Sequence, residues 1–206
     1  MPTLVETVKA AQHLEKVLFP PLCFSMVLPG VFRSGHPNRH NFPYLDSLGL
    51  KSIMYLSPDD YRPDTHNWAI ERNLNIFHLR IDVSKDPTVE VDEELVVEAL
   101  EKVLDSRNLP ILIHDNKGRI LPSLISAILR LMTNWTLESA LLEYRMFLPP
   151  ADDWVTDLET KNKDKTRLGK PKKEKERIAD IQLIDRFPLE KLRYDPEFAP
   201  SWLRDR

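Results

Sequence analysis

The sequence contains little cysteine and little glycine, and its histidines are scattered. Cys23 is the only cysteine among 206 residues, so an intrachain disulfide is impossible and a cysteine-based metal site is not expected. Its apolar neighbours in the segment 21–24 favour the interpretation of Cys23 as a small core or boundary residue over that of a relocated nucleophile. Among the six histidines only His36 and His40 have H-x-x-x-H spacing, and no cysteine or third histidine lies within ten residues of this pair. The sequence therefore predicts no metal site and no cofactor.

Long apolar runs are also missing. No stretch approaches the ~20 apolar residues that a membrane-spanning helix requires. Near the N-terminus, Glu6, Lys9, Glu15 and Lys16 interrupt any apolar core, so no signal peptide is predicted. We therefore expect a cytoplasmic protein, present in the cytosol, the nucleus or both.

The chain as a whole has no strong excess of charge of one sign, but one segment of it does. The net charge is −3, yet residues 161–177 contain nine Lys or Arg and three Asp or Glu, which gives this segment +6 and leaves −9 for the rest. A basic run can attract nucleic acid, anionic lipid or polyphosphate, but it is more often a solvated linker. We interpret the run as a linker and predict no nucleic-acid partner.

The sequence does contain an apolar strand, a glycine-containing loop and an apolar helix in direct succession. The strand begins at Ile111, the loop follows His114 and contains Gly118, and the helical run extends over 122–132. This layout gathers unpaired backbone N–H groups around an anion. The sequence therefore predicts a phosphate-binding cradle in the loop.

The cradle has the spacing of a known catalytic motif. In cysteine-dependent phosphatases the motif is His-Cys-x5-Arg, in which the thiolate attacks phosphorus and the arginine holds the phosphoryl oxygens with a bidentate fork. His114 stands in the place of the histidine, but Asp115 replaces the cysteine and Leu121 replaces the arginine. The nucleophile and the clamp are both missing. His114 is expected to anchor the loop through a backbone or carboxylate hydrogen bond.

Three further segments carry the same resemblance: FSMV at 24–27, GVFRSGHP at 30–37 and NFPYL at 41–45. With them the chain resembles the plant and fungal atypical dual-specificity phosphatases, whose fungal branch includes the oxidant-induced cell-cycle arrest proteins. The resemblance covers roughly 20–147 and resumes at 180–187. It implies an α/β fold of the cysteine-phosphatase type, with a central, mostly parallel sheet and helices on both faces. The alternation of predicted strands and helices along the chain indicates the same architecture.

Asp115 decides the predicted function. A carboxylate at the floor of the cradle is a weaker nucleophile than a thiolate, and it can accept the N–H bonds meant for phosphate and act as a built-in anion. We therefore predict a non-catalytic phosphatase-like protein that serves as a scaffold or regulatory subunit, with phosphatase-like members of the same fungal family as partners. Two alternatives stay open: a sensor that binds an inositol polyphosphate, and a residual tyrosine or inositol pyrophosphate phosphatase. The substrate class follows from the resemblance alone.

The other candidate residues each have a functional and a structural interpretation. Arg33 could hold an anion, or it could tie its loop to a buried carboxylate. Lys117 and Arg119 could bind a polyanion at the mouth of the cradle, or they could be solvated loop cations. Asp82 and Asp86 lie where related phosphatases present a general acid, but without a nucleophile they are better explained as turn or cap residues.

The chain is predicted to divide into five parts. An amphipathic helix over 1–18 precedes a phosphatase-like domain over 19–148, and a polar, basic insertion over 149–177 separates this domain from its returning helix at 178–187. The tail over 188–206 is too apolar to be solvated, so we expect it to lie in extended form along a surface groove of this chain or another. Within the domain, apolar spacing predicts two strands in 23–32, strands at 52–56, 74–81 and from 111, and helices over 42–48, 64–73, 92–106, 122–132 and 134–147.

Overall fold

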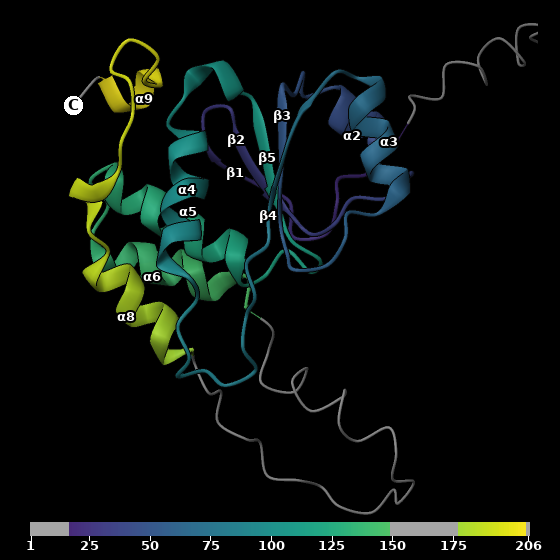
Figure 1. Cartoon of the computed structure of the whole chain (residues 1–206). Helices are drawn as coiled ribbons and strands as arrows, with labels where there is room; N and C mark the ends of the chain where they lie inside the picture. The colour runs from purple at the N-terminus through teal and green to yellow at the C-terminus, as the bar shows by residue number, and fades with distance from the viewer. Residues whose placement is uncertain (1–16, 149–176, 205–206) are drawn as a thin grey trace, which may run out of the picture.

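The computed structural model describes residues 17–148 and 177–204, and a five-stranded sheet lies at its centre (Figure 1). The strands are β1 Ser25–Leu28, β2 Val31–Ser34, β3 Ser52–Leu56, β4 Asn75–Leu79 and β5 Ile111–His114. Their order in the sheet is β1-β2-β5-β3-β4. β1 pairs with β2 in antiparallel fashion, and the other three pairings are parallel. The prediction of a mostly parallel sheet is therefore confirmed.

Helices cover both faces of this sheet. They are α2 Phe42–Asp46, α3 Pro63–Glu71, α4 Glu93–Val103, α5 Leu121–Met132, α6 Leu137–Met146 and α8 Ile178–Arg186. In Figure 1, α2 and α3 lie on one side of the strands, and α4, α5, α6 and α8 lie on the other. Two apolar clusters correspond to these two layers, and the smaller one contains Leu45, Ile53 and Trp68. The predicted α/β architecture with helices on both faces is confirmed.

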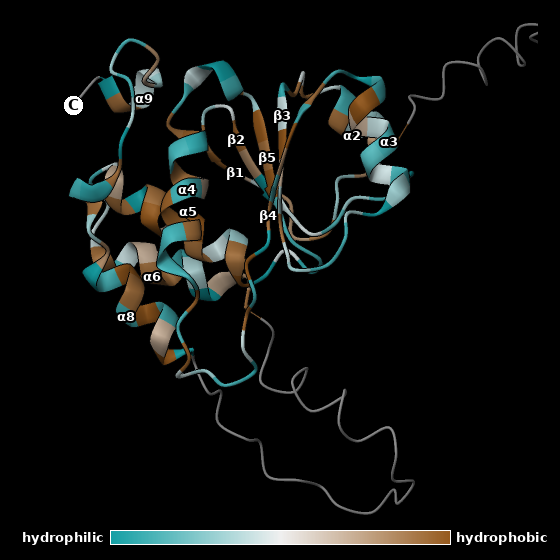
Figure 2. Ribbon diagram, viewed as in Figure 1, coloured by the Kyte–Doolittle hydropathy of each residue, from teal (hydrophilic) through white to brown (hydrophobic). Residues whose placement is uncertain are grey.

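The helix that follows the predicted cradle is enclosed on almost all sides. Ten of the twelve residues of α5 are buried, and hydrophobic residues predominate along it and along the strands (Figure 2). A helix that is apolar around its whole circumference has to lie inside the protein. Because α5 is fixed by packing in this way, its N-terminal N–H groups have a fixed position relative to β5.

Local capping sets the ends of α4. The carboxylate of Asp92 accepts two backbone N–H bonds of the first turn, as a capping residue does. The helix ends at Val103 and not at the predicted residue 106. Asp105 causes the difference, because its carboxylate accepts the N–H of Arg107 at 2.9 Å and begins a separate 3-10 turn, Ser106–Asn108. The remaining predicted elements within the described residues are present, with ends shifted by a few residues.

A buried ion pair fixes the returning helix α8. The Nε of Arg177 lies 2.9 Å from the carboxylate of Asp180, and the Tyr144 hydroxyl donates to the same carboxylate at 2.6 Å. Arg177 also donates to the carbonyl of Ser84 at 2.6 Å. The sequence placed Arg177 in the solvated insertion, and this assignment was wrong. A carboxylate as buried as that of Asp180 requires a charged partner, and Arg177 supplies it.

The tail lies on its own chain. The carbonyl of Phe198 accepts the N–H of Ser106 at 2.8 Å, the guanidinium of Arg107 stacks 4.0 Å from the Phe198 ring, and Lys191 pairs with Glu93 at 2.8 Å. The tail therefore packs on the surface of its own chain, which is one of the two predicted possibilities. The extended form is only partly correct, because the tail contains a 3-10 turn, Leu189–Lys191, and a short helix, α9 Ser201–Arg204.

Two predicted segments fall outside the described residues. The amphipathic helix over 1–18 does so except for Val17 and Leu18, and the basic insertion does so up to residue 176. Both stay predictions. In the part of the chain that the structure describes, no helix is both long enough and apolar enough to span a membrane.

Candidate functional site

The predicted cradle is the loop of residues 115–120 between β5 and α5, and the side chain of Asp115 occupies it. Asp115 Oδ1 accepts the N–H of Lys117 at 2.9 Å and also the N–H of Gly118. The N–H of Leu121, the first residue of α5, bonds to the same carboxylate. Backbone N–H groups that converge on one point at a helix N-terminus form an anion site. Here the anion in that site is a carboxylate of the protein.

Two opposing effects act on the charge of Asp115. Burial raises the pKa of the Asp115 carboxyl, while the N–H groups of Gly118 and Lys117 and the charge of Arg33 act to lower it. Burial has the larger effect, so the net pKa lies above the usual range of an aspartate. The carboxylate is therefore held in place by hydrogen bonds but gains a proton more readily than an exposed aspartate.

Arg33 supports the loop from below. Its side chain is completely buried, Nη2 donates to the carbonyl of Gly118, and the guanidinium lies 3.8 Å from the centre of the Phe147 ring. Burial lowers the pKa of Arg33 to about 10, and the charge of Asp115 opposes this shift. Nε and Nη1 have no hydrogen-bond partner among the described residues. Of the two predicted roles, the structure shows a tie to the loop, through a carbonyl and not through a carboxylate.

Two glycines allow the neighbouring loop to touch the cradle. Gly118 has φ +74°, and a Cβ atom on it would lie 2.3 Å from the backbone nitrogen of Gly35. A Cβ on Gly35 would in turn lie 3.0 Å from the carbonyl carbon of Lys117. Contacts this short leave no room for a side chain, and the positive φ favours glycine independently. The loop after β2 and the cradle loop therefore pack backbone against backbone.

His114 belongs to a group of aromatic side chains beneath the loop. It is completely buried, and its Nε2 lies 2.9 Å from the Tyr61 hydroxyl. Its ring centre lies 5.0 Å from those of His36 and Tyr55. His114 contacts the loop backbone, as predicted, because its Nδ1 lies 3.4 Å from the carbonyl oxygen of Asp115; the phenol of Tyr61 is a second partner that was not predicted. We call this group the imidazole–phenol cluster; its members are His36, Tyr55, Tyr61, His66, His78 and His114.

Sequence reasoning missed most of this cluster. The Tyr55 hydroxyl donates to Asn116 Oδ1 at 2.9 Å, which ties the loop to β3. Tyr55 faces His78 on one neighbouring strand and His114 on the other in the parallel register. Polar residues at the carboxyl ends of adjacent parallel strands meet at one edge of the sheet, where α/β proteins bind ligands. The occurrence of Tyr or His near the end of three predicted strands was the signal that could have revealed the cluster.

The remaining candidates do not converge on the carboxylate of Asp115. Lys117 is exposed and Arg119 is half-buried at the mouth of the loop. Asp82 is exposed, and Asp86 accepts the N–H and the hydroxyl of Thr88 at 2.9 and 2.7 Å, as a turn residue does.

Leu121 does not face the cradle as a phosphate-binding arginine would. Leu121 is buried in the larger apolar cluster. Within residues 17–148 and 177–204, no group of three or more His, Cys, Asp or Glu is arranged to hold a metal ion.

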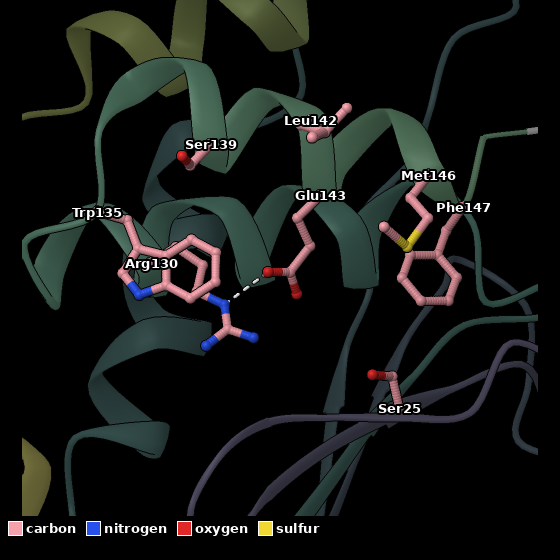
Figure 3. Close-up of a pocket in the computed structure, with 8 residues that line it drawn as sticks. All are labelled: Ser25, Arg130, Trp135, Ser139, Leu142, Glu143, Met146 and Phe147. Atoms are coloured by element: carbon pink, nitrogen blue, oxygen red, sulfur yellow. Dashed lines mark hydrogen bonds and ion pairs between the residues drawn. The ribbon is translucent and has the colours of Figure 1, made fainter.

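A separate hollow of about 350 Å³ lies between α6 and β1 (Figure 3). Trp135 and Arg130 lie at one end of it, and Met146 and Phe147 lie at the other. Arg130 pairs with Glu143 at 2.5 Å along its floor. Phe147 also covers the guanidinium of Arg33, so this hollow and the cradle share one aromatic side chain.

The imidazole–phenol cluster predicts a loss of stability in acid. Burial, which is the larger cause, and the mutual proximity of the two imidazoles lower the pKa of His114 well below its usual value; burial also lowers the pKa of His36. The unfolded chain therefore binds protons that the folded chain does not, as the pH falls through about 6.5. The free energy of unfolding should decrease by about 1–3 kcal/mol between about pH 7.5 and 5.5, measured by urea denaturation.

A non-titrating ring provides the control for this prediction. Phenylalanine at position 36 keeps an aromatic side chain in the cluster, so His36→Phe should reduce the pH dependence of stability. Among residues 17–148 and 177–204, Nε2 of His36 has no hydrogen-bond partner to lose, whereas the Nδ1 contact with the Pro37 carbonyl at 3.0 Å is lost at every pH. An unchanged pH dependence in this variant would assign the acid effect to other groups.

Comparisons with known proteins identify the family of the chain. A model of the tyrosine phosphatase family matches residues 18–197. The chain belongs to the tyrosine phosphatase family. Inositol diphosphatase DSP1 of Oryza sativa subsp. japonica is 32% identical over 182 residues, which are 88% of this chain and 71% of that protein. A Mycosarcoma maydis protein named OCA1 is 33% identical over 132 residues, 64% of this chain and 84% of that protein. The resemblance to plant and fungal members is confirmed.

The similarity extends to a solved member of the family. The structure of the Siw14 catalytic core superposes with a TM-score of 0.71 at 29% identity and covers 86% of this chain and 92% of that chain. The inositol diphosphatase SIW14 of Saccharomyces cerevisiae is 33% identical over 148 residues, which are 71% of this chain and 53% of that protein. The predicted cysteine-phosphatase-type fold is therefore confirmed for this member of the tyrosine phosphatase family.

Proposed function

We propose that this chain is a non-catalytic member of the tyrosine phosphatase family that acts as a scaffold or regulatory subunit for other members. One observation carries the proposal: the Asp115 carboxylate accepts the N–H groups of Lys117, Gly118 and Leu121. These donors would otherwise bind the phosphoryl oxygens of a substrate. A substrate therefore has to displace a side chain that is covalently part of the loop.

Electrostatics add to this competition. A phosphate monoester carries close to two negative charges at neutral pH. Opposite a carboxylate at contact distance it meets about 1 to 4 kcal/mol of repulsion per charge pair, for an effective dielectric between water and a protein surface. Leu121 lies in the apolar core, so no guanidinium fork extends from the start of α5 to compensate. Arg33 is covered by the loop itself.

The groups that would complete the reaction support the same conclusion. A general acid protonates the leaving oxygen only after a nucleophile has attacked phosphorus. Asp86 uses its carboxylate within its own turn, and Asp82 is exposed. The rest of the fold is retained, including a core that packs α5 and α6 behind the loop. Retention of the fold without the reactive groups is what a scaffold requires.

A second candidate function is retained turnover of inositol pyrophosphates. The names of the relatives favour it, because both the rice and the yeast protein are inositol diphosphatases. In this case Asp115 would have to leave the cradle and attack the terminal phosphorus, the bond from this phosphorus to the leaving phosphate oxygen would break, and water would then hydrolyse the acyl phosphate. Carboxylate nucleophiles occur in other phosphotransferases, so the chemistry has precedent.

A turnover assay distinguishes the two functions. The chain is incubated with an inositol pyrophosphate and with a small aryl phosphate, and phosphate release is compared for the unmodified chain, Asp115→Asn and Asp92→Asn. Asp92 is a matched control, because its carboxylate also accepts two backbone N–H bonds but caps α4. We expect no release above background from any of the three. Release that Asp115→Asn abolishes and Asp92→Asn retains would overturn the scaffold proposal and establish the second function.

A further inference from the structure

We propose that the cradle exchanges its internal carboxylate for an external doubly charged oxyanion in mild acid, so that Asp115 works as a proton-operated plug. The inference rests on the proposed function, because it requires a loop that holds an anion without converting it. The ligand class is a tetrahedral dianion, either free in solution or as the phosphate group of a larger molecule.

The first step is a competition for the same donors. Asp115 takes the N–H groups of Lys117, Gly118 and Leu121, and an external oxyanion needs these same groups. At neutral pH the internal group has the advantage, because it is tethered and carries a negative charge that repels the competitor. Binding from solution then requires that the internal group lose its charge.

The second step is the protonation of Asp115. The charged side chain that faces it is that of Arg33 from β2, with Glu143 of α6 beyond the guanidinium, whereas Lys117 is exposed at the mouth of the loop. A protonated carboxyl is a weaker acceptor of N–H bonds than a carboxylate and no longer repels an anion. Burial raises the pKa of Asp115, which brings this protonation closer to neutral pH.

The third step is the protonation of the imidazole–phenol cluster. His114 directly precedes Asp115, and its ring lies 5.0 Å from that of His36. A proton on either ring places a positive charge beneath the cradle, where it attracts an anion. Neutral aromatic rings surround both imidazoles, and the ionisable or charged groups that face them come from several elements: Tyr55 of β3, Tyr61 and Arg62 of the following loop, Asp64 of α3 and His78 of β4.

The two protonation steps act in the same direction as the pH falls. Burial raises the pKa of Asp115 and lowers the pKa values of His36 and His114. Protonation changes the loop from a site with its own anion above neutral rings to one with a neutral carboxyl, and each imidazole that gains a proton adds positive charge beneath it. Arg33, which the loop covers, adds a buried positive charge below the cradle, and its Nε and Nη1 have no hydrogen-bond partner among the described residues.

Sulfate is the probe for the test, because it keeps both charges throughout this range, whereas phosphate groups titrate near pH 6. The full chain is titrated with sulfate at constant ionic strength at about pH 7.5 and about pH 5, and the backbone amide resonances of Lys117 and Gly118 report binding at the cradle itself. We expect sulfate to bind at least about tenfold more tightly in acid. Inositol hexakisphosphate and inorganic phosphate form parallel arms that distinguish a phosphorylated molecule from the free ion.

Variants separate the two protonation steps. Asp115→Asn has the shape of the protonated side chain, so at about pH 7.5 it should bind sulfate more tightly than the unmodified chain does at that pH, and the histidine step should tighten its binding further in acid. Asp115→Ser serves the same purpose if the asparagine variant does not fold. Asp92→Asn should behave as the unmodified chain, and His36→Phe should reduce the pH dependence that remains in Asp115→Asn.

Three results would overturn the proposal: binding that does not change with pH, tighter binding in acid that leaves the Lys117 and Gly118 amides unaffected, and Asp115→Asn binding that stays as weak as that of the unmodified chain at neutral pH. These failures are distinct from a failure of the proposed function. A chain without turnover and without acid-dependent binding remains a scaffold with a permanent plug. A chain with turnover that depends on Asp115 is an enzyme, whatever its affinity for sulfate.

Discussion

Asp115→Cys combined with Leu121→Arg is expected to turn over an aryl phosphate at least about a hundredfold faster than either single variant. The cysteine supplies a thiolate at the floor of the cradle, and the arginine supplies the missing fork for the phosphoryl oxygens. Because the two groups act on the same transition state, neither is expected to suffice alone. Phosphate release by the double variant and both single variants is the measurement.

The arginine carries a cost in stability that the experiment has to control. Leu121 is 2% exposed and packs in the larger apolar cluster, so its loss should lower the free energy of unfolding by about 2–5 kcal/mol. Leu121→Met conserves side-chain volume and serves as the control for packing alone. An inactive double variant whose unfolding transition remains cooperative would contradict the prediction and would show that the segment 120–123 has diverged further from a catalytic loop.

Gly118→Ala is expected to lower the free energy of unfolding by about 3 kcal/mol or more, a large effect for the addition of one methyl group. The new Cβ would lie 2.3 Å from the nitrogen of Gly35 and 2.7 Å from the carbonyl carbon of Ser34. Both neighbours are backbone atoms, so a side-chain rotation cannot relieve the overlap. The loop after β2 would have to move away from the cradle, and the bond from Arg33 to the Gly118 carbonyl would be strained with it.

Gly49→Ala is the matched control for this substitution. Gly49 has φ +61°, close to that of Gly118, but nothing lies within 4 Å of the position of its Cβ. It should therefore show only the conformational cost of a positive φ, about 1–2 kcal/mol. Denaturant unfolding of the two variants separates strain in φ from contact between the loops. If both variants lose the same free energy of unfolding, the overlap of the new Cβ with Gly35 adds nothing to the cost of the Gly118 substitution.

The order and type of the elements could be predicted from the sequence, because the patterns that specify them are local. Alternating apolar strands and amphipathic helices gave the mostly parallel sheet, and the motif spacing gave the position of Asp115 at the start of the cradle loop. The occupation of the cradle by the carboxylate followed from its length and charge. Each of these inferences uses residues that are neighbours in sequence.

Contacts between distant residues could not be predicted in the same way. Arg177 appeared in a run of lysines and arginines, and only the buried Asp180 and the carbonyl of Ser84 distinguish it from its solvated neighbours. Arg33 meets Gly118 across 85 positions of sequence, and His114 meets Tyr61 across 53. Such partners depend on how β2, β3 and β5 are placed side by side, which no local pattern specifies.

The backbone contact between Gly35 and Gly118 has a consequence for how such a chain can evolve. The cradle keeps its curvature because a neighbouring loop and a buried guanidinium hold it from outside, and neither contact involves the side chain at position 115. The identity of that side chain can therefore change without collapse of the loop. The atoms that shape the cradle are thus separate from the side chain at its floor, so a substitution at position 115 can alter the chemistry of the loop while the fold and the surface stay the same.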